Sequence, residues 1–141
     1  EVSEADLVRF MKGLVKLRHC KPELLAAFEE VLRTKSRYFH PVSMTNLISA
    51  FSFFEMSESF FMRLLQDIAK CTSKLPPLSV MHVLTALCRQ QGKLSRSAFE
   101  RPLEKLCAQL GSLGNQMSPM QAVACMAALS RLQQRDLATL S

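Results

Sequence analysis

Apolar residues recur at spacings of three, four and seven positions in four segments of the chain, the pattern of one buried face of an α-helix. The segments align with one another: "SEADLVRFMKGLVKLRH" from residue 3, "HPVSMTNLISAFSFFEM" from 40, "PPLSVMHVLTALCRQQG" from 76 and "SPMQAVACMAALSRLQQ" from 118. Their aligned starts are separated by 37 (4 to 41), 36 (41 to 77) and 42 residues (77 to 119). A recurrence near this length predicts a stack of helical repeats.

The start of each segment has the features of a helix N-terminus. Proline, whose missing N–H and fixed φ suit the first helical turn, occupies three of the four aligned starts: Pro41, Pro77 and Pro119, with Glu4 in the first segment. Ser118 and Gln121 have the spacing of a capping box. We therefore expect four helices to begin at these aligned positions.

One aligned position is small in every segment, and its members are Gly13, Ala50, Ala86 and Ala128. A small residue on a helix face lets a second helix cross closely, at about 8–10 Å between axes. Alanine is also simply a good helix former, but glycine is not. Two columns of apolar residues lie beside it on the same helix face: Phe10, Leu47, Val83 and Cys125 in one, and Met11, Ile48, Leu84 and Met126 in the other.

A second amphipathic segment follows each of the first three, at 21–39, 57–71 and 95–110. Pro102 interrupts the last of them, so that helix either starts near Phe99 or is kinked. The glycine-containing stretch "GSLGNQM", 111–117, is predicted to be the turn that lengthens the third step. "RDLATLS", 135–141, is expected to begin a further second helix.

Composition agrees with helices: glycine is scarce at 4 residues, tryptophan is absent, and alternating β-branched runs are missing. We therefore predict an all-α fold, a right-handed α-solenoid of helix-turn-helix repeats with a period near 37 residues. The chain is expected to form a single domain, 1–141, with repeats at about 3–39, 40–75 and 76–117 and an incomplete one at 118–141.

The first-helix segments resemble the heptatricopeptide and octotricopeptide repeats of organellar RNA-metabolism proteins, which include Fas-activated serine/threonine kinase-like and RAP-containing relatives. "SPMQAVACMAALSRL" is closely similar to their first helix, and "SEADLVRFMKGLVKL" is the poorest match. The resemblance implies an α-solenoid in mitochondria or plastids that binds RNA or ribonucleoprotein partners, and we expect the mitochondrial matrix. The family usually carries more repeats and often a RAP module, so a scaffold role is at least as well supported as sequence-specific RNA recognition.

The opposite face of the first helices carries polar and mostly basic residues in aligned columns. Stacked repeats would bring them into one stripe, which we predict to bind RNA or a partner: Arg9, Lys12, Lys16, Asn46, Phe53, His82, Arg89 and Arg131. Cations in such a stripe suit phosphates, and amide, imidazole and aromatic groups suit bases. A solvated helix face and a protein-binding face are the alternatives.

Two other surfaces are candidates. A secondary basic cluster lies near the end of the first second helix, where cations also simply suit the helix dipole: Arg33, Lys35, Arg37 and Tyr38. The incomplete last repeat leaves an apolar face with little cover, which we expect to dock a partner: Val123, Met126 and Leu129.

The remaining chemistry is sparse. The net charge of +6 permits an acidic partner without requiring one. Five cysteines without a CxxC and three scattered histidines favour neither a disulfide framework nor a metal site. No nucleophile elbow or phosphate-binding glycine loop occurs. No apolar run reaches the roughly 20 residues of a membrane span.

These observations favour a non-enzymatic scaffold or RNA-associated protein in a mitochondrial ribonucleoprotein assembly, such as a mitoribosome or an RNA-processing or RNA-editing complex. We expect neighbouring proteins and RNA as partners, and no cofactor, metal, small-molecule substrate or membrane span. The alternative is a structural subunit of an organellar membrane complex with no RNA contact.

Overall fold

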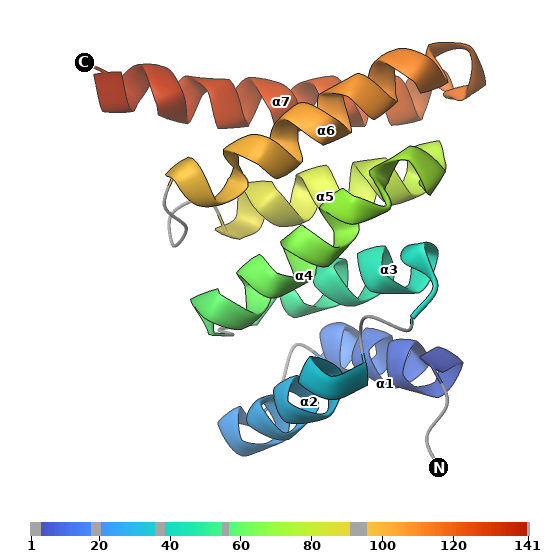
Figure 1. The fold of residues 1–141 in the computed structure, drawn as a ribbon, viewed down its shortest axis with the longest axis vertical. Helices are drawn as coiled ribbons and strands as arrows, with labels where there is room; N and C mark the ends of the chain where they lie inside the picture. The colour runs from blue at the N-terminus through green and yellow to red at the C-terminus, as the bar shows by residue number, and fades with distance from the viewer. Residues whose placement is uncertain (1–3, 18–20, 36–38, 55–56, 91–95, 141) are drawn as a thin grey trace.

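The computed structural model describes residues 4–17, 21–35, 39–54, 57–90 and 96–140 (Figure 1). These residues contain α-helices, two short 3-10 turns at Thr72–Lys74 and Gly114–Gln116, and no strand, so the prediction of an all-α fold is confirmed. The α-helices are α1 (Glu4–Leu17), α2 (Pro22–Lys35), α3 (Pro41–Phe51), α4 (Glu58–Lys70), α5 (Pro77–Gln90), α6 (Arg96–Leu113) and α7 (Pro119–Leu140).

The odd-numbered helices begin at the positions that the alignment predicts. α1 starts on Glu4, and α3, α5 and α7 each start on a proline. The predicted capping box is formed, since the Gln121 amide N–H donates to Ser118 Oγ at 3.1 Å and the Ser118 N–H donates to Gln121 Oε1 at 3.0 Å. These bonds satisfy N–H groups that a helix start leaves without a partner.

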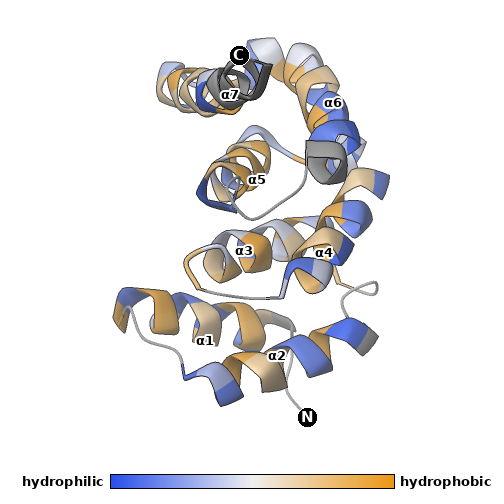
Figure 2. Cartoon of the chain, turned by 90° about the vertical axis from the view of Figure 1, so that its left-hand side faces the viewer, coloured by the Kyte–Doolittle hydropathy of each residue, from blue (hydrophilic) through white to orange (hydrophobic). Residues whose placement is uncertain are grey.

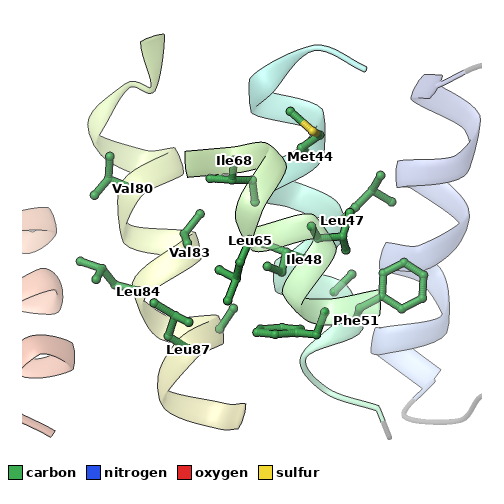
Figure 3. Close-up of a cluster of buried hydrophobic side chains, with 14 of the residues drawn as sticks. Met44, Leu47, Ile48, Phe51, Leu65, Ile68, Val80, Val83, Leu84 and Leu87 are labelled. Atoms are coloured by element: carbon green, nitrogen blue, oxygen red, sulfur yellow. The ribbon is translucent and has the colours of Figure 1, made fainter. Parts of the chain in front are cut away.

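The helices lie in two layers (Figure 2). α1, α3, α5 and α7 follow one another in the first layer, with contacts between α1 and α3, α3 and α5, and α5 and α7. The even-numbered helices lie in the second, where α4 contacts α6. The buried side chains form one core between and within the layers, and Figure 3 shows Leu65 of α4 between the apolar side chains of α3 and those of α5.

Polar side chains of one helix pair bond to backbone groups in or next to a neighbouring pair. Glu29 of α2 accepts from the Ser57 amide at 2.9 Å, at the start of α4. Gln90 of α5 donates to the Ser52 carbonyl at 2.8 Å, just after α3. Gln109 of α6 donates to the Leu75 carbonyl at 2.9 Å. Helix ends have backbone groups without intrahelical partners, so these bonds tie neighbouring pairs together.

Two expectations for the later part of the chain are wrong. α6 runs from Arg96 to Leu113, so it starts before Phe99 and contains both Pro102 and Gly111. The start near Phe99 is thus wrong, and the alternative, a kink at Pro102, stays a prediction. Residues 111–113 therefore belong to α6, and the turn predicted over 111–117 is limited to residues 114–117. In addition, α7 continues to Leu140, so residues 135–140 extend the first helix of the last repeat and do not begin a second one.

The small column behaves as predicted in three of its four members. Ala50, Ala86 and Ala128 are buried, and the Cys88 thiol of α5 lies 3.3 Å from the Ala128 carbonyl of α7. This column therefore faces the preceding helix of the first layer. Gly13 is exposed, and a Cβ added to it would meet no atom within 4 Å. Within the described residues the expectation of a close crossing at Gly13 is wrong, because none of the described helices packs on that face of α1.

Candidate nucleic-acid interface

The predicted stripe lies on the open side of the first layer. Its long cations and Phe53 are exposed, whereas Asn46 and His82 are half-buried: the exposed members are Arg9, Lys12, Lys16, Phe53, Arg89 and Arg131. The five cations come from α1, α5 and α7, and Phe53 lies just after the end of α3. The contacts of α3 with α1 and α5, and of α5 with α7, bring these helices side by side.

Arg89 and Phe53 form the best-ordered part of the stripe. The guanidinium carbon of Arg89 lies 3.7 Å from the centroid of the Phe53 ring, within the range of a cation–π contact. Its Nη1 donates to Ser52 Oγ at 2.8 Å and lies 3.4 Å from the Ser49 carbonyl. Arg89 therefore both binds the C-terminal end of α3 and holds a fixed position on the stripe.

His82 reports the electrostatic character of this surface. Its pKa is lowered from the ordinary 6.5, first by partial burial and then by the positive charges of Lys12 and Arg89. These two cations come from α1 and α5, so side chains of two helices contribute to the positive potential at His82. The imidazole is consequently neutral near pH 7, able to donate one hydrogen bond and accept another.

The lowered pKa makes a prediction for stability. Between the folded-state pKa and 6.5 the unfolded chain binds more protons at His82 than the folded one, so stability falls as pH drops through this window. Urea unfolding at a series of pH values should show this fall in the wild type and a smaller fall in His82→Gln. Identical pH dependence in the two proteins would mean that His82 does not carry the effect.

A groove between α5 and α7 adjoins the stripe. Its volume is 310 Å³, and it is lined by Thr85, Cys88, Arg89, Ala124, Ala127, Ala128 and Arg131. The small side chains of three alanines on α7 leave the space of the groove, and Arg89 and Arg131 supply positive charge. The groove is not visible in the sequence pattern as a site, although Ala124 and Ala127 occupy columns that carry larger polar residues in other repeats. Such a groove has room for a phosphate group or a small side chain.

Charge is divided unevenly between the layers. Among the described side chains of the odd-numbered helices, Asp6 is the only carboxylate, and it lies in the first turns of α1. The same side chains include the five cations of the stripe. The second layer is mixed in charge, and it carries the other described carboxylates of the helices: Glu23, Glu29, Glu30, Glu58, Asp67, Glu100 and Glu104.

The other predicted clusters are less well placed. Arg33 is exposed on α2, the side chain of Lys35 is not described, and Arg37 and Tyr38 lie outside the described residues. At the last helix, Val123 and Met126 are exposed, as expected for a docking face. Leu129 is instead half-buried and packs against the core.

The described residues offer little for metal binding or redox chemistry. No group of three histidine, cysteine or acidic side chains lies close enough together in these ranges to hold a metal ion. Cys71, Cys88, Cys107 and Cys125 are free thiols, and burial is the main cause that raises the pKa of each. A raised pKa keeps a thiol protonated and less nucleophilic.

The arrangement as a whole suits an extended polyanion better than a small substrate. Cations are spread along one side of the first layer, and aromatic, amide and imidazole groups lie among them.

In the part of the chain that the structure describes, no helix has the length and apolar character to cross a membrane. No protein-family model, no curated protein and no solved structure matches this chain.

Proposed function

We propose that this protein is a non-enzymatic scaffold that binds the backbone of single-stranded RNA along the open side of its first layer. On this proposal the chain is a right-handed α-solenoid of about 37-residue repeats and acts in a mitochondrial ribonucleoprotein assembly. The assignment to mitochondria rests on the resemblance of the first helices to organellar repeat proteins.

The observation that carries the proposal is the segregation of charge. Among the described side chains of the odd-numbered helices there are five cations and one carboxylate, Asp6, which lies near the start of α1. Binding of such a surface to phosphates releases counterions from the nucleic acid, which favours association without sequence preference. Burial is the main cause of the lowered pKa of His82, and the positive charges of Lys12 and Arg89 add to it, which agrees with a positive surface at this place.

The site offers two kinds of contact to a strand. Arg9, Lys12, Lys16 and Arg131 are exposed and suited to phosphates. Arg89 is already held by its contacts with Phe53 and Ser52. The stacked Arg89 and Phe53 side chains therefore offer a fixed platform against which a base can stack. The neutral His82 imidazole has hydrogen-bonding capacity for a base edge.

The experiment compares two variants with the same change in net charge. In the first, Arg9, Lys12, Lys16 and Arg131 are replaced by glutamine. Arg89 is left unchanged because it also binds the end of α3. In the control variant, four exposed cations of the second layer are replaced by glutamine: Arg33, Arg63, Lys70 and Arg101. Binding of a labelled single-stranded RNA is measured over a series of salt concentrations.

The stripe variant should bind RNA more weakly. The slope of log K against log salt should become less steep by about 3 units, since each phosphate contact on a single strand contributes roughly 0.7 to the slope. The control should keep most of the slope. Both should stay folded, because exposed charges contribute little to stability. Equal losses in the two variants would point to net charge alone and contradict the proposal. Unchanged RNA binding with loss of a protein partner would assign the stripe to protein docking.

A further inference from the structure

The first layer has two different faces, and one of them is uncovered on α1. Three aligned columns face the preceding helix. Their members on or just after α3, and on α5 and α7, are buried apart from the half-buried Phe54: Leu47, Val83 and Cys125; Ala50, Ala86 and Ala128; Phe54, Gln90 and Leu132. The corresponding residues of α1 are Phe10, Gly13 and Leu17. All three are exposed, and the exposed fractions are 52% for Phe10 and 75% for Leu17.

The mirror-image situation holds on α7. The columns that face the following helix are buried or half-buried in α1, α3 and α5: Val8, Thr45 and Met81; Met11, Ile48 and Leu84. Their members on α7 are Val123 and Met126, which are 68% and 66% exposed. The two ends of the described layer therefore each present one half of the contact that is made repeatedly inside it.

The uncovered face of α1 is hollowed. A groove of 470 Å³ is lined by Asp6, Arg9, Phe10, Gly13, Leu14 and Leu17. Gly13 leaves open space at its centre, since a Cβ there would meet nothing within 4 Å. A glycine in the middle of a helix is less favourable than alanine. In α3, α5 and α7 the equivalent small residue is buried against the preceding helix.

We propose that this groove receives α7 of a second copy of the chain, so that molecules associate head to tail. Val123 and Met126 of one copy would lie against Phe10, Gly13 and Leu17 of the next, as Ile48 and Leu84 lie in the contacts inside the layer. The second copy is the occupant because its exposed face has the same helical spacing as the faces that already cover Ala50, Ala86 and Ala128. This association does not depend on RNA binding.

The geometry and charge of the contact define its behaviour. A contact between two different faces leaves one of each free, so growth beyond a dimer is open-ended unless the assembly closes into a ring. Lys16, Phe53, Arg89 and Arg131 occupy one aligned column, and Arg89 contacts Phe53 inside the layer. In the proposed contact, Arg131 of one copy would lie near Lys16 of the next, so two positive charges would approach each other. Salt screens such repulsion, and association should therefore strengthen as salt is raised, opposite to RNA binding.

The test uses the whole chain in sedimentation velocity over a range of protein concentrations. Two variants block one face each: Gly13→Leu fills the groove on α1, and Met126→Glu places a charge on the α7 face. Wild type should show a mass that rises with concentration past that of a dimer. Each variant alone should stay monomeric, because every copy lacks the same half of the contact.

An equimolar mixture of the two variants distinguishes head-to-tail contact from a symmetric one. Only one productive joint remains, between the free α1 face of Met126→Glu and the free α7 face of Gly13→Leu, so the mixture should form a dimer and grow no further. Thermal unfolding supplies the folding control, because leucine is a better helix former than glycine and Gly13 has open space. A wild type that stays monomeric at all concentrations, or Gly13→Leu that associates like wild type, overturns the proposal.

Discussion

Phe51→Ala is expected to lower the free energy of unfolding by about 3–5 kcal/mol, the usual loss for a buried phenylalanine. The Phe51 side chain is fully buried at the end of α3. Its ring lies edge-on to Phe60 of α4, with centroids 5.5 Å apart, and to Phe28 of α2 at 6.5 Å. One substitution therefore removes aromatic contacts to both neighbouring helices of the second layer and leaves a cavity among them.

Urea unfolding followed by circular dichroism measures this loss, and Phe53→Ala is the matched control. Phe53 lies two residues away, but its ring is exposed and contacts Arg89. Its removal should cost on the order of 0.5–1 kcal/mol, the range of an exposed cation–π contact. Similar losses for the two variants would contradict the assignment of Phe51 to the core.

Ala86→Leu is expected to destabilise the protein by about 1–3 kcal/mol through overpacking. Ala86 is fully buried in α5, in the column of the first layer that faces α3. α5 also contacts α6 and α7, so it has little freedom to move away from a larger side chain. The extra atoms must therefore displace side chains from their preferred rotamers or shift a helix.

Two leucine substitutions provide controls in chemical unfolding. Thr85→Leu adds bulk at the neighbouring residue, which is half-buried and lines the open groove between α5 and α7. Gly13→Leu adds bulk to the exposed member of the same column. Both should cost far less than Ala86→Leu. Equal losses at residues 85 and 86 would show that the close approach of helices lies elsewhere.

Much of the helix framework follows from the sequence because local chemistry determines it. Proline at the first turn and the Ser118–Gln121 capping box act within a few residues, and the helix starts are predicted correctly. The sequence leaves open whether α6 starts near Phe99 or runs through Pro102, because a proline in a helix interior is normally unfavourable. Pro102 is buried on α6, the helix that packs against α4, so tertiary contacts outweigh the local preference.

In the candidate site, too, some features follow from the local sequence and others depend on tertiary contacts. The column pattern identifies which residues of the first helices are outward, and the cations of the stripe are exposed. A residue in an aligned column is buried only where a neighbouring helix covers it. For this reason Ala86 is buried and Gly13 is exposed, although the two occupy the same column. The groove between α5 and α7 depends on the space between two helices, which no single segment specifies.

The caps that pass from one helix pair to the next have a consequence for how the protein unfolds. Glu29, Gln90 and Gln109 each satisfy a backbone group in or next to a neighbouring pair. Opening one pair alone would leave the polar groups of its neighbour without partners, at a penalty of about 1–3 kcal/mol for each buried group. Interior pairs are thus coupled to one another, and local opening is cheapest at the two ends. The molecule should melt inward from its termini, with α3 to α5 as the last cooperative unit to lose structure.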